Sequence, residues 1–150
     1  MKLRKDGFTA IDLVMVIIIA GILAVTVAVK WPGKSINIYA QADQVVQDIR
    51  YAQSLAMARA TTGQRYQIVF ASTSYTITNN IGTIIKTVPL DTGLAFTSNG
   101  FTGGYLSFDS LGRPYNGTVR MTANLSVAVT GGGFTKTITV WRNTGAVEVG

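Results

Sequence analysis

Residues 13–29 read LVMVIIIAGILAVTVAV, an apolar run without charge in which Thr26 is the one clearly polar residue. Extended back to Phe8 the run covers 22 residues, interrupted by Thr9, Asp12 and Thr26. At about 1.5 Å per residue such a helix rises roughly 33 Å, which matches a hydrocarbon core of about 30 Å. The sequence therefore predicts an N-terminal transmembrane α-helix.

A short basic leader, with Lys2, Arg4 and Lys5 beside Asp6, precedes the apolar run. Positive charge on this flank predicts a cytoplasmic N-terminus and export of the rest of the chain. One interpretation is a secretory signal peptide, although the run is long and its cleavage site only passable. A second is a plain membrane anchor. A third interpretation assigns a function to Asp12, because placing a carboxylate inside an apolar span costs free energy and such a group usually has a partner.

Residues 5–13, KDGFTAIDL, followed by the apolar run, resemble the N-terminal signal of type IV pilins and type II secretion pseudopilins. That family has a basic leader ending in glycine, then Phe-Thr-Leu-Ile-Glu and a long hydrophobic helix. The resemblance implies that prepilin peptidase cuts after Gly7 and that Phe8 becomes the N-methylated first residue. Asp12 stands where the family has glutamate, and Ala10 replaces the usual leucine.

The resemblance also implies an assembly role for Asp12, whose carboxylate would take the Phe8 amine of a neighbouring subunit. On its own helix Phe8 lies one turn from Asp12, so a pair within one subunit is the alternative. Either partner lowers the cost of holding an ion among apolar chains. A partner in the neighbouring subunit would in addition fix the axial register of a head-to-tail polymer.

The chain after the apolar run predicts a kink and then a second helical stretch. Pro32 and Gly33 interrupt the helix at the expected membrane interface. Helical signals resume near Ser35 and continue to about Ala60, with a core-facing stripe of Val45, Ile49, Ala52 and Ala56. Residues 48–59 resemble the matching helix of FimT/GspH-type minor pilins and pseudopilins.

The remaining sequence has short β-branched and aromatic runs between turn residues, which is typical of an antiparallel sheet. The predicted strands are residues 67–71, 74–78, 83–88, 105–109, 118–130 and 134–140, with a short one after Gly145. The fold class predicted is α+β and pilin-like, a long N-terminal membrane helix packed on a C-terminal antiparallel β-sheet. Its expected parts are the leader peptide 1–7, the transmembrane and assembly half of the helix 8–30, the kinked linker and amphipathic half 31–61, and the globular β domain 62–150.

Composition argues against an enzyme. The 150 residues include no cysteine and no histidine, which excludes disulfides, Cys-ligated zinc and His-based triads. Asp91 and Asp109 are the most easily imagined carboxylate pair, but both sit beside turn residues, where aspartate is common. No GxxxxGK[ST] phosphate loop is present. We therefore expect no catalytic residues, no cofactor and no metal.

DNA binding is the alternative that the charge suggests. The formal net charge is +6, and removal of the leader would leave ten basic and six acidic side chains. Such a surface could contact phosphates and stack on bases through Tyr105 or Trp141. Some FimT-like minor pilins bind DNA, which implies a C-terminal Gly-Arg-x-Arg element, whereas residues 145–148 here read GAVE. The possible DNA contacts are Arg113, Arg120, Lys136 and Arg142.

The predicted function is a structural subunit, a minor pilin or pseudopilin, of a type IV pilus or type II secretion pseudopilus assembled head-to-tail from the inner membrane. The alternative is a DNA-binding minor pilin for DNA uptake. The expected partners are other pilin or pseudopilin subunits, prepilin peptidase, the inner-membrane assembly platform, membrane lipid and, in the alternative, DNA. The expected location is a single-pass position in the inner membrane with a cytoplasmic N-terminus, followed by a periplasmic pseudopilus or extracellular pilus.

Overall fold

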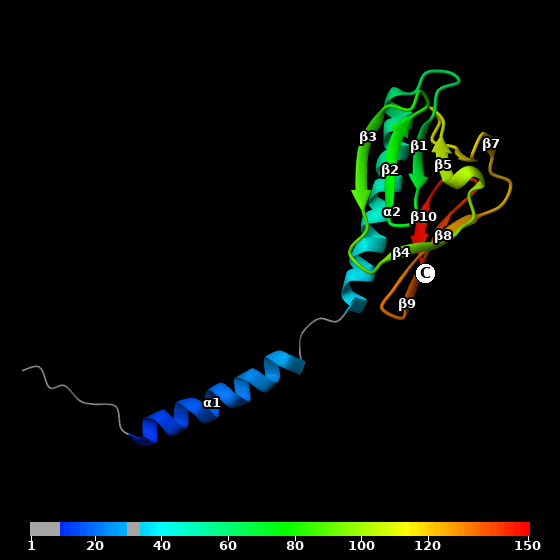
Figure 1. The fold of residues 1–150 in the computed structure, drawn as a ribbon. Helices are drawn as coiled ribbons and strands as arrows, with labels where there is room; N and C mark the ends of the chain where they lie inside the picture. The colour runs from blue at the N-terminus through cyan, green and yellow to red at the C-terminus, as the bar shows by residue number, and fades with distance from the viewer. Residues whose placement is uncertain (1–9, 30–33) are drawn as a thin grey trace, which may run out of the picture. The chain divides into compact units, whose positions relative to one another are not determined.

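The chain divides into two units, Met1–Gly33 and Lys34–Gly150, in a computed structural model that describes residues 10–29 and 34–150. The first unit contains helix α1 (Ala10–Val29), and the second contains all the other described elements (Figure 1). The predicted processing residues Gly7 and Phe8 and the predicted kink at Pro32 lie outside the described residues.

Helix α2 (Lys34–Arg59) supplies one wall of the core of the second unit. The predicted stripe is confirmed, because Val45, Ile49, Ala52 and Ala56 are all fully buried. Ile38 and Ala42 extend the stripe toward the start of the helix. The spacing of three and four residues places these side chains on one helix face, as expected for an amphipathic helix that packs on a sheet.

Ten antiparallel strands form two sheets in the described residues. The first sheet has six strands, in the order β3 (Ile84–Pro89), β2 (Ser74–Asn79), β1 (Tyr66–Phe70), β5 (Tyr105–Phe108), β6 (Pro114–Asn116) and β7 (Val119–Arg120). The second has four, in the order β10 (Val147–Val149), β9 (Phe134–Val140), β8 (Leu125–Gly131) and β4 (Ala95–Asn99). A short 3₁₀ turn, η1 (Thr102–Gly104), precedes β5.

Both sheets pack on α2, which contacts β1 and β5 of the first sheet and β8, β9 and β10 of the second. Figure 1 shows the helix running behind β1 and β2. The first sheet buries Ile68 and Leu106 against the helix, and the second buries Ile138 and Val140. Because side chains alternate between the two faces of a strand, the residues next to these four along each strand have their side chains on the opposite face, away from the helix.

The predicted fold is wrong in its main feature. In place of one long membrane helix packed on one sheet, the described residues form two helices, of 20 and 26 residues, and two sheets. Only α2 packs on the sheets within its unit. The apolar pattern and the amphipathic pattern belong to two different helices, and only the second has a polar face that suits the surface of a sheet domain.

The predicted inner-membrane location is also contradicted. Among the residues that the structure describes, neither helix is long and apolar enough to span a membrane. The described part of α1 is Ala10–Val29, with Asp12 in its first turn.

The predicted strand over residues 118–130 is divided between the sheets. Residues 119–120 form β7 at one edge of the first sheet, and residues 125–131 form β8 in the second. The chain changes sheet at the intervening residues, where Met121 is buried and its amide donates to the Pro114 carbonyl. A β-branched run predicts extended backbone but not which sheet the backbone joins, and the prediction did not include β4 or β6.

Candidate functional site

Two surfaces of the described residues are candidates for a functional site, one in each unit. The first is α1, which exposes large apolar side chains all around its circumference. Ile11 is 69% exposed and Ile17 is 63% exposed. The others are Leu13, Val14, Met15, Val16, Ile18, Ile19, Ile22 and Leu23, each more than half exposed. A helix that is apolar on all sides is normally buried, so α1 is a surface for association.

Asp12 lies in the first turn of this helix, and its side chain is exposed within the chain. A carboxylate in the first turn interacts favourably with the positive end of the helix dipole. Asp12 is also the one charged residue of α1. The residue that the sequence analysis assigns to assembly therefore marks one end of an otherwise apolar surface.

The second surface lies on the first sheet and contains two of the four predicted DNA contacts. Arg120 on β7 is directly opposite Tyr115 on β6, and Arg113 immediately precedes β6. Residues opposite each other in neighbouring strands have their side chains on the same face. Arg113, Tyr115 and Arg120 are therefore neighbours at the β6 and β7 edge of this sheet.

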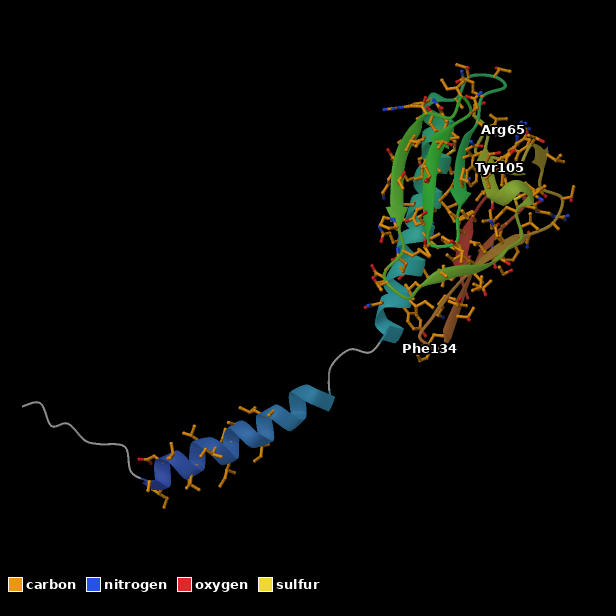
Figure 2. All side chains as sticks on the ribbon, viewed as in Figure 1. Arg65, Tyr105 and Phe134 are labelled. Atoms are coloured by element: carbon orange, nitrogen blue, oxygen red, sulfur yellow. The ribbon has the colours of Figure 1, made fainter. Side chains whose placement is uncertain are left out.

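The other two predicted contacts lie elsewhere. The Lys136 ammonium, on β9 of the second sheet, lies 4.4 Å from the centre of the Tyr39 ring on α2. Phe134, two residues earlier on β9, is at the opposite end of the sheet unit from Arg65 and Tyr105 (Figure 2). Arg142 donates from Nη1 to the Thr122 carbonyl at 2.6 Å, in the connection between the sheets. The four residues thus do not form one basic face.

Arg65, which sequence reasoning missed, is the centre of the second surface. Its guanidinium carbon lies 3.9 Å from the centre of the Tyr115 ring, and Nη1 donates to the Thr118 carbonyl at 3.0 Å. Ion pairs in the described residues join Lys86 to Asp48 and Arg113 to Asp109, and none includes Arg65. Its only sequence signal is a position just before a strand, because the aromatic partner is fifty residues away.

Asp109, in the turn between β5 and β6, holds neighbouring groups of the second surface in place through hydrogen bonds. Its Oδ2 accepts from Arg113 Nε at 2.7 Å and from the Tyr115 hydroxyl at 3.2 Å, and its Oδ1 accepts from the Leu111 and Arg113 amides. Burial opposes ionisation, but these hydrogen bonds and the Arg113 charge outweigh it and lower the pKa of Asp109 below its ordinary value. The carboxylate is ionised at neutral pH and cancels the charge of Arg113.

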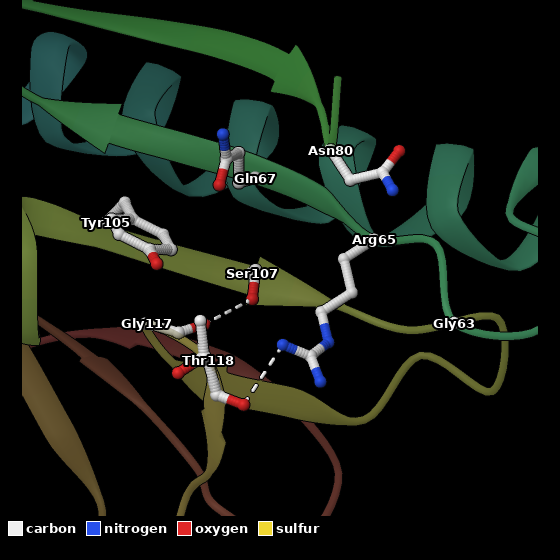
Figure 3. A pocket seen from close by; sticks show the side chains of 8 residues that line it. All are labelled: Gly63, Arg65, Gln67, Asn80, Tyr105, Ser107, Gly117 and Thr118. Atoms are coloured by element: carbon white, nitrogen blue, oxygen red, sulfur yellow. Dashed lines mark hydrogen bonds between the residues drawn. The ribbon is translucent and has the colours of Figure 1, made fainter. Parts of the chain in front are cut away.

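Two adjoining pockets share Arg65. The larger, of about 380 Å³, is lined by Arg65, Asp109, Arg113 and Tyr115, together with Thr62, Gly63, Gln64, Ser110 and Leu111. The smaller, of about 180 Å³, is lined by Gly63, Arg65, Gln67, Asn80, Tyr105, Ser107, Gly117 and Thr118 (Figure 3). Both pockets contain Gly63 and Arg65; apart from Arg65, the larger is lined by the charged Asp109 and Arg113 and the smaller by uncharged residues.

Asp91 and Asp109, the carboxylates considered as a possible catalytic pair, do not form an acid–base pair. The Asp91 amide donates to the Gln41 side chain near the start of α2, whereas Gly112, beside Asp109, lies against Met57 near the helix end. The described residues also contain no group of three or more acidic side chains that could hold a metal ion. What the Arg65 surface offers is a cation, aromatic rings and amide groups, which are suited to binding.

Comparison with models of protein families, with curated proteins and with solved structures gives no match. A function is therefore inferred from the residues and the geometry of this chain.

Proposed function

We propose that this chain is a structural subunit of a helical filament of the type IV pilus or type II secretion pseudopilus kind, in which α1 is the assembly element. The observation that carries the proposal is the all-round exposure of apolar side chains on α1, exemplified by Ile11 and Ile17. Packing α1 helices from many copies together removes this surface from water, at about 25 cal/mol for each Å² buried. A repeated head-to-tail contact of this kind generates a helical filament.

Asp12 would set the register of that packing. Inside a bundle of apolar helices an ionised carboxylate is costly unless a cation lies beside it. The cation implied by the prepilin-like signal is the amine that cleavage after Gly7 creates on Phe8. Since each copy supplies one carboxylate and one amine, pairing between neighbouring copies selects one axial offset. Residues 48–59, which resemble the helix of FimT/GspH-type minor pilins, favour a minor pilin or pseudopilin over a major subunit.

Fibre incorporation tests the proposal. We expect Asp12→Ala and Asp12→Asn to be cleaved after Gly7 normally but to enter sheared fibres at about a tenth of the wild-type level or less. That decrease corresponds to about 1.4 kcal/mol or more per contact. Asp12→Glu keeps the charge and should incorporate at close to the wild-type level. Intact mass gives the mature N-terminus of each variant.

The matched control is Asp43→Ala, which removes an exposed carboxylate from α2. It should incorporate normally. Wild-type incorporation of both Asp12→Ala and Asp12→Asn would contradict the role of Asp12 in assembly. Absence of the wild-type chain from fibres, in cells that assemble them, would contradict the filament proposal itself.

A second candidate function is DNA binding, in the form of a DNA-binding minor pilin. The observation that favours it is the group of three arginines, Arg65, Arg113 and Arg120, around Tyr115 on one face of the first sheet. Arginines beside a partly exposed aromatic ring suit both phosphate contacts and base stacking. Salt-dependent binding of the full chain to labelled DNA tests this candidate.

A further inference from the structure

We propose that the two pockets sharing Arg65 bind one nucleoside phosphate unit of a single nucleic-acid strand, with the phosphate at Arg65 and the base in the smaller pocket beside Tyr105. The inference rests on the second candidate function, DNA binding, and names its site and the form of nucleic acid bound. It is independent of filament assembly.

The phosphate position follows from the charges around the larger pocket. Arg113 and Asp109 form a close pair, with Nη2 and Oδ2 2.6 Å apart, so their charges cancel. Arg65 has no carboxylate within ion-pair distance among the described residues, which leaves the pocket with one uncompensated positive charge. A phosphate at this position would neutralise it.

The Arg65 guanidinium is held in place before any ligand binds. One face lies against the Tyr115 ring, and one N–H is committed to the Thr118 carbonyl. A guanidinium has five N–H donors, so others remain for a phosphate, which it can contact with two parallel hydrogen bonds. A fixed cation binds with less loss of side-chain entropy than a mobile one.

The smaller pocket suits a planar group that carries hydrogen-bonding edges. Figure 3 shows Tyr105 on β5, Gln67 on β1 and Asn80 in the turn after β2 around this pocket. The two amides can each donate and accept, as the edge of a base requires. At about 180 Å³ the pocket is smaller than a typical small-molecule site. It therefore fits the base of a ligand whose phosphate lies in the adjoining larger pocket.

The space beside Tyr105 depends on Gly117. This glycine has φ of +62°, and a Cβ on it would lie 3.3 Å from the Thr102 carbonyl oxygen and 3.6 Å from the Tyr105 hydroxyl. Ser107 donates to the Gly117 carbonyl at 2.9 Å and so fixes the turn. The edge of Tyr105 is thus kept clear by the backbone of the turn between β6 and β7.

The geometry favours a single strand over a duplex. In a duplex the bases are stacked and paired, so a base could enter a pocket only after it is flipped out. In a single strand the bases are free to stack on tyrosine, and the flexible backbone lets a phosphate reach the adjacent arginine. Two adjoining pockets, one charged and one neutral, match this alternation of phosphate and base.

Binding of the full chain to a labelled thymidine strand of about 15 nucleotides, followed by fluorescence anisotropy, tests the inference. We expect Arg65→Ala to weaken binding about tenfold and to reduce the salt dependence by about one phosphate contact. Tyr105→Ala should weaken binding about 5- to 150-fold, whereas Tyr105→Phe keeps the ring and should bind within about twofold of wild type. Circular dichroism establishes that each variant is folded, and Arg65→Gln, which also removes the charge, replaces Arg65→Ala if the latter is not.

Lys136→Ala is the charge-matched control, because it removes one positive charge from the second sheet. It should change binding less than about twofold. A wild-type affinity that both Arg65→Ala and Tyr105→Ala leave unchanged would overturn the site while DNA binding stands. Tighter binding to duplex than to the single strand, or equal binding to thymidine monophosphate or inorganic phosphate, would overturn the strand assignment. No binding to any nucleic acid would overturn the DNA-binding function as well.

Discussion

The ammonium of Lys86 on β3 lies 2.6 Å from Oδ1 and 2.8 Å from Oδ2 of Asp48, a buried carboxylate on α2. Tyr75 on β2 donates its hydroxyl to the same Oδ2 at 2.6 Å. Burial, followed by this hydrogen bond to the Asp48 carboxylate, raises the pKa of Tyr75 well above its ordinary value. One helical carboxylate therefore ties α2 to two strands of the first sheet.

We expect Asp48→Ala to lower the free energy of unfolding by about 3 kcal/mol, because it leaves the buried Tyr75 hydroxyl and the Lys86 ammonium without their acceptor. Lys86→Met should cost about 1 kcal/mol, since the lysine is partly exposed and the tyrosine keeps its partner. Urea denaturation of the full chain, monitored by circular dichroism, measures both. Asp43→Ala, on the exposed face of α2, should change the value by less than about 0.5 kcal/mol. Equal values for Asp48→Ala and Asp43→Ala would contradict the structural role of Asp48.

A substitution at Gly145 should also lower the stability of the fold, because this residue has φ of +70° in a crowded turn. A Cβ there would lie 2.7 Å from Gln53 Nε2 and 2.9 Å from Phe108 Cε1, and Gln53 uses that nitrogen to join the Gly112 and Thr144 carbonyls. Gly145→Ala should therefore destabilise the fold by about 2–5 kcal/mol, from the backbone strain and from the overpacking.

Gly133→Ala separates the two causes. Gly133 also has positive φ, +84°, but has open space at its Cβ position, so only the backbone strain of about 1–2 kcal/mol should remain. Thermal melts of the two variants give the difference. Identical melting temperatures would show that the contact with Gln53 and Phe108 relaxes at no cost.

The lowered pKa of Asp109 predicts how stability depends on pH. Because its pKa is lower in the folded than in the unfolded chain, its stabilisation is fully present above the unfolded value of about 3.9 and is lost as pH falls through the folded value. Asp109→Asn should cost about 1–3 kcal/mol at pH 7 and flatten the stability curve below about pH 4. Denaturation midpoints between pH 2 and pH 7 provide the measurement. Curves that stay parallel over this range would contradict the assignment to Asp109, and Asp91→Asn, in an exposed turn, is the control variant.

Local patterns were enough to predict α2 and most of the strands. The stripe through Val45, Ile49, Ala52 and Ala56 is a spacing of three and four residues that any helix places on one face, whatever it packs against. The strands near residues 67–71, 74–78 and 134–140 are short runs bounded by turns, and each matches a strand of the structure within one or two residues. These features depend on backbone geometry and neighbouring residues alone.

Pattern was not enough to predict the two separate helices or the ion pair of Lys86. The apolar run ending at Val29 and the amphipathic residues after Lys34 each predict helix, but nothing local determines whether the two helices pack on the same sheet. Lys86 points to the helix side of its strand because it is opposite Ile77, a core residue of β2. Its ion pair with Asp48 then depends on a contact between residues thirty-eight positions apart.

Local sequence patterns with periods of 3.6 and 2 residues predict the segments: an apolar helix with Asp12 near its start, an amphipathic helix, and a series of antiparallel strands. Which strands share a sheet follows from the folded unit, and so does the stacking of Arg65 on Tyr115, with Lys136 on the other sheet. The physical reason is that side-chain period is a local property of the backbone, whereas strand order and helix packing minimise the exposed apolar surface of the whole unit. Residues distant in sequence become neighbours through that minimisation, and a binding surface built from them exists only once the sheet has formed.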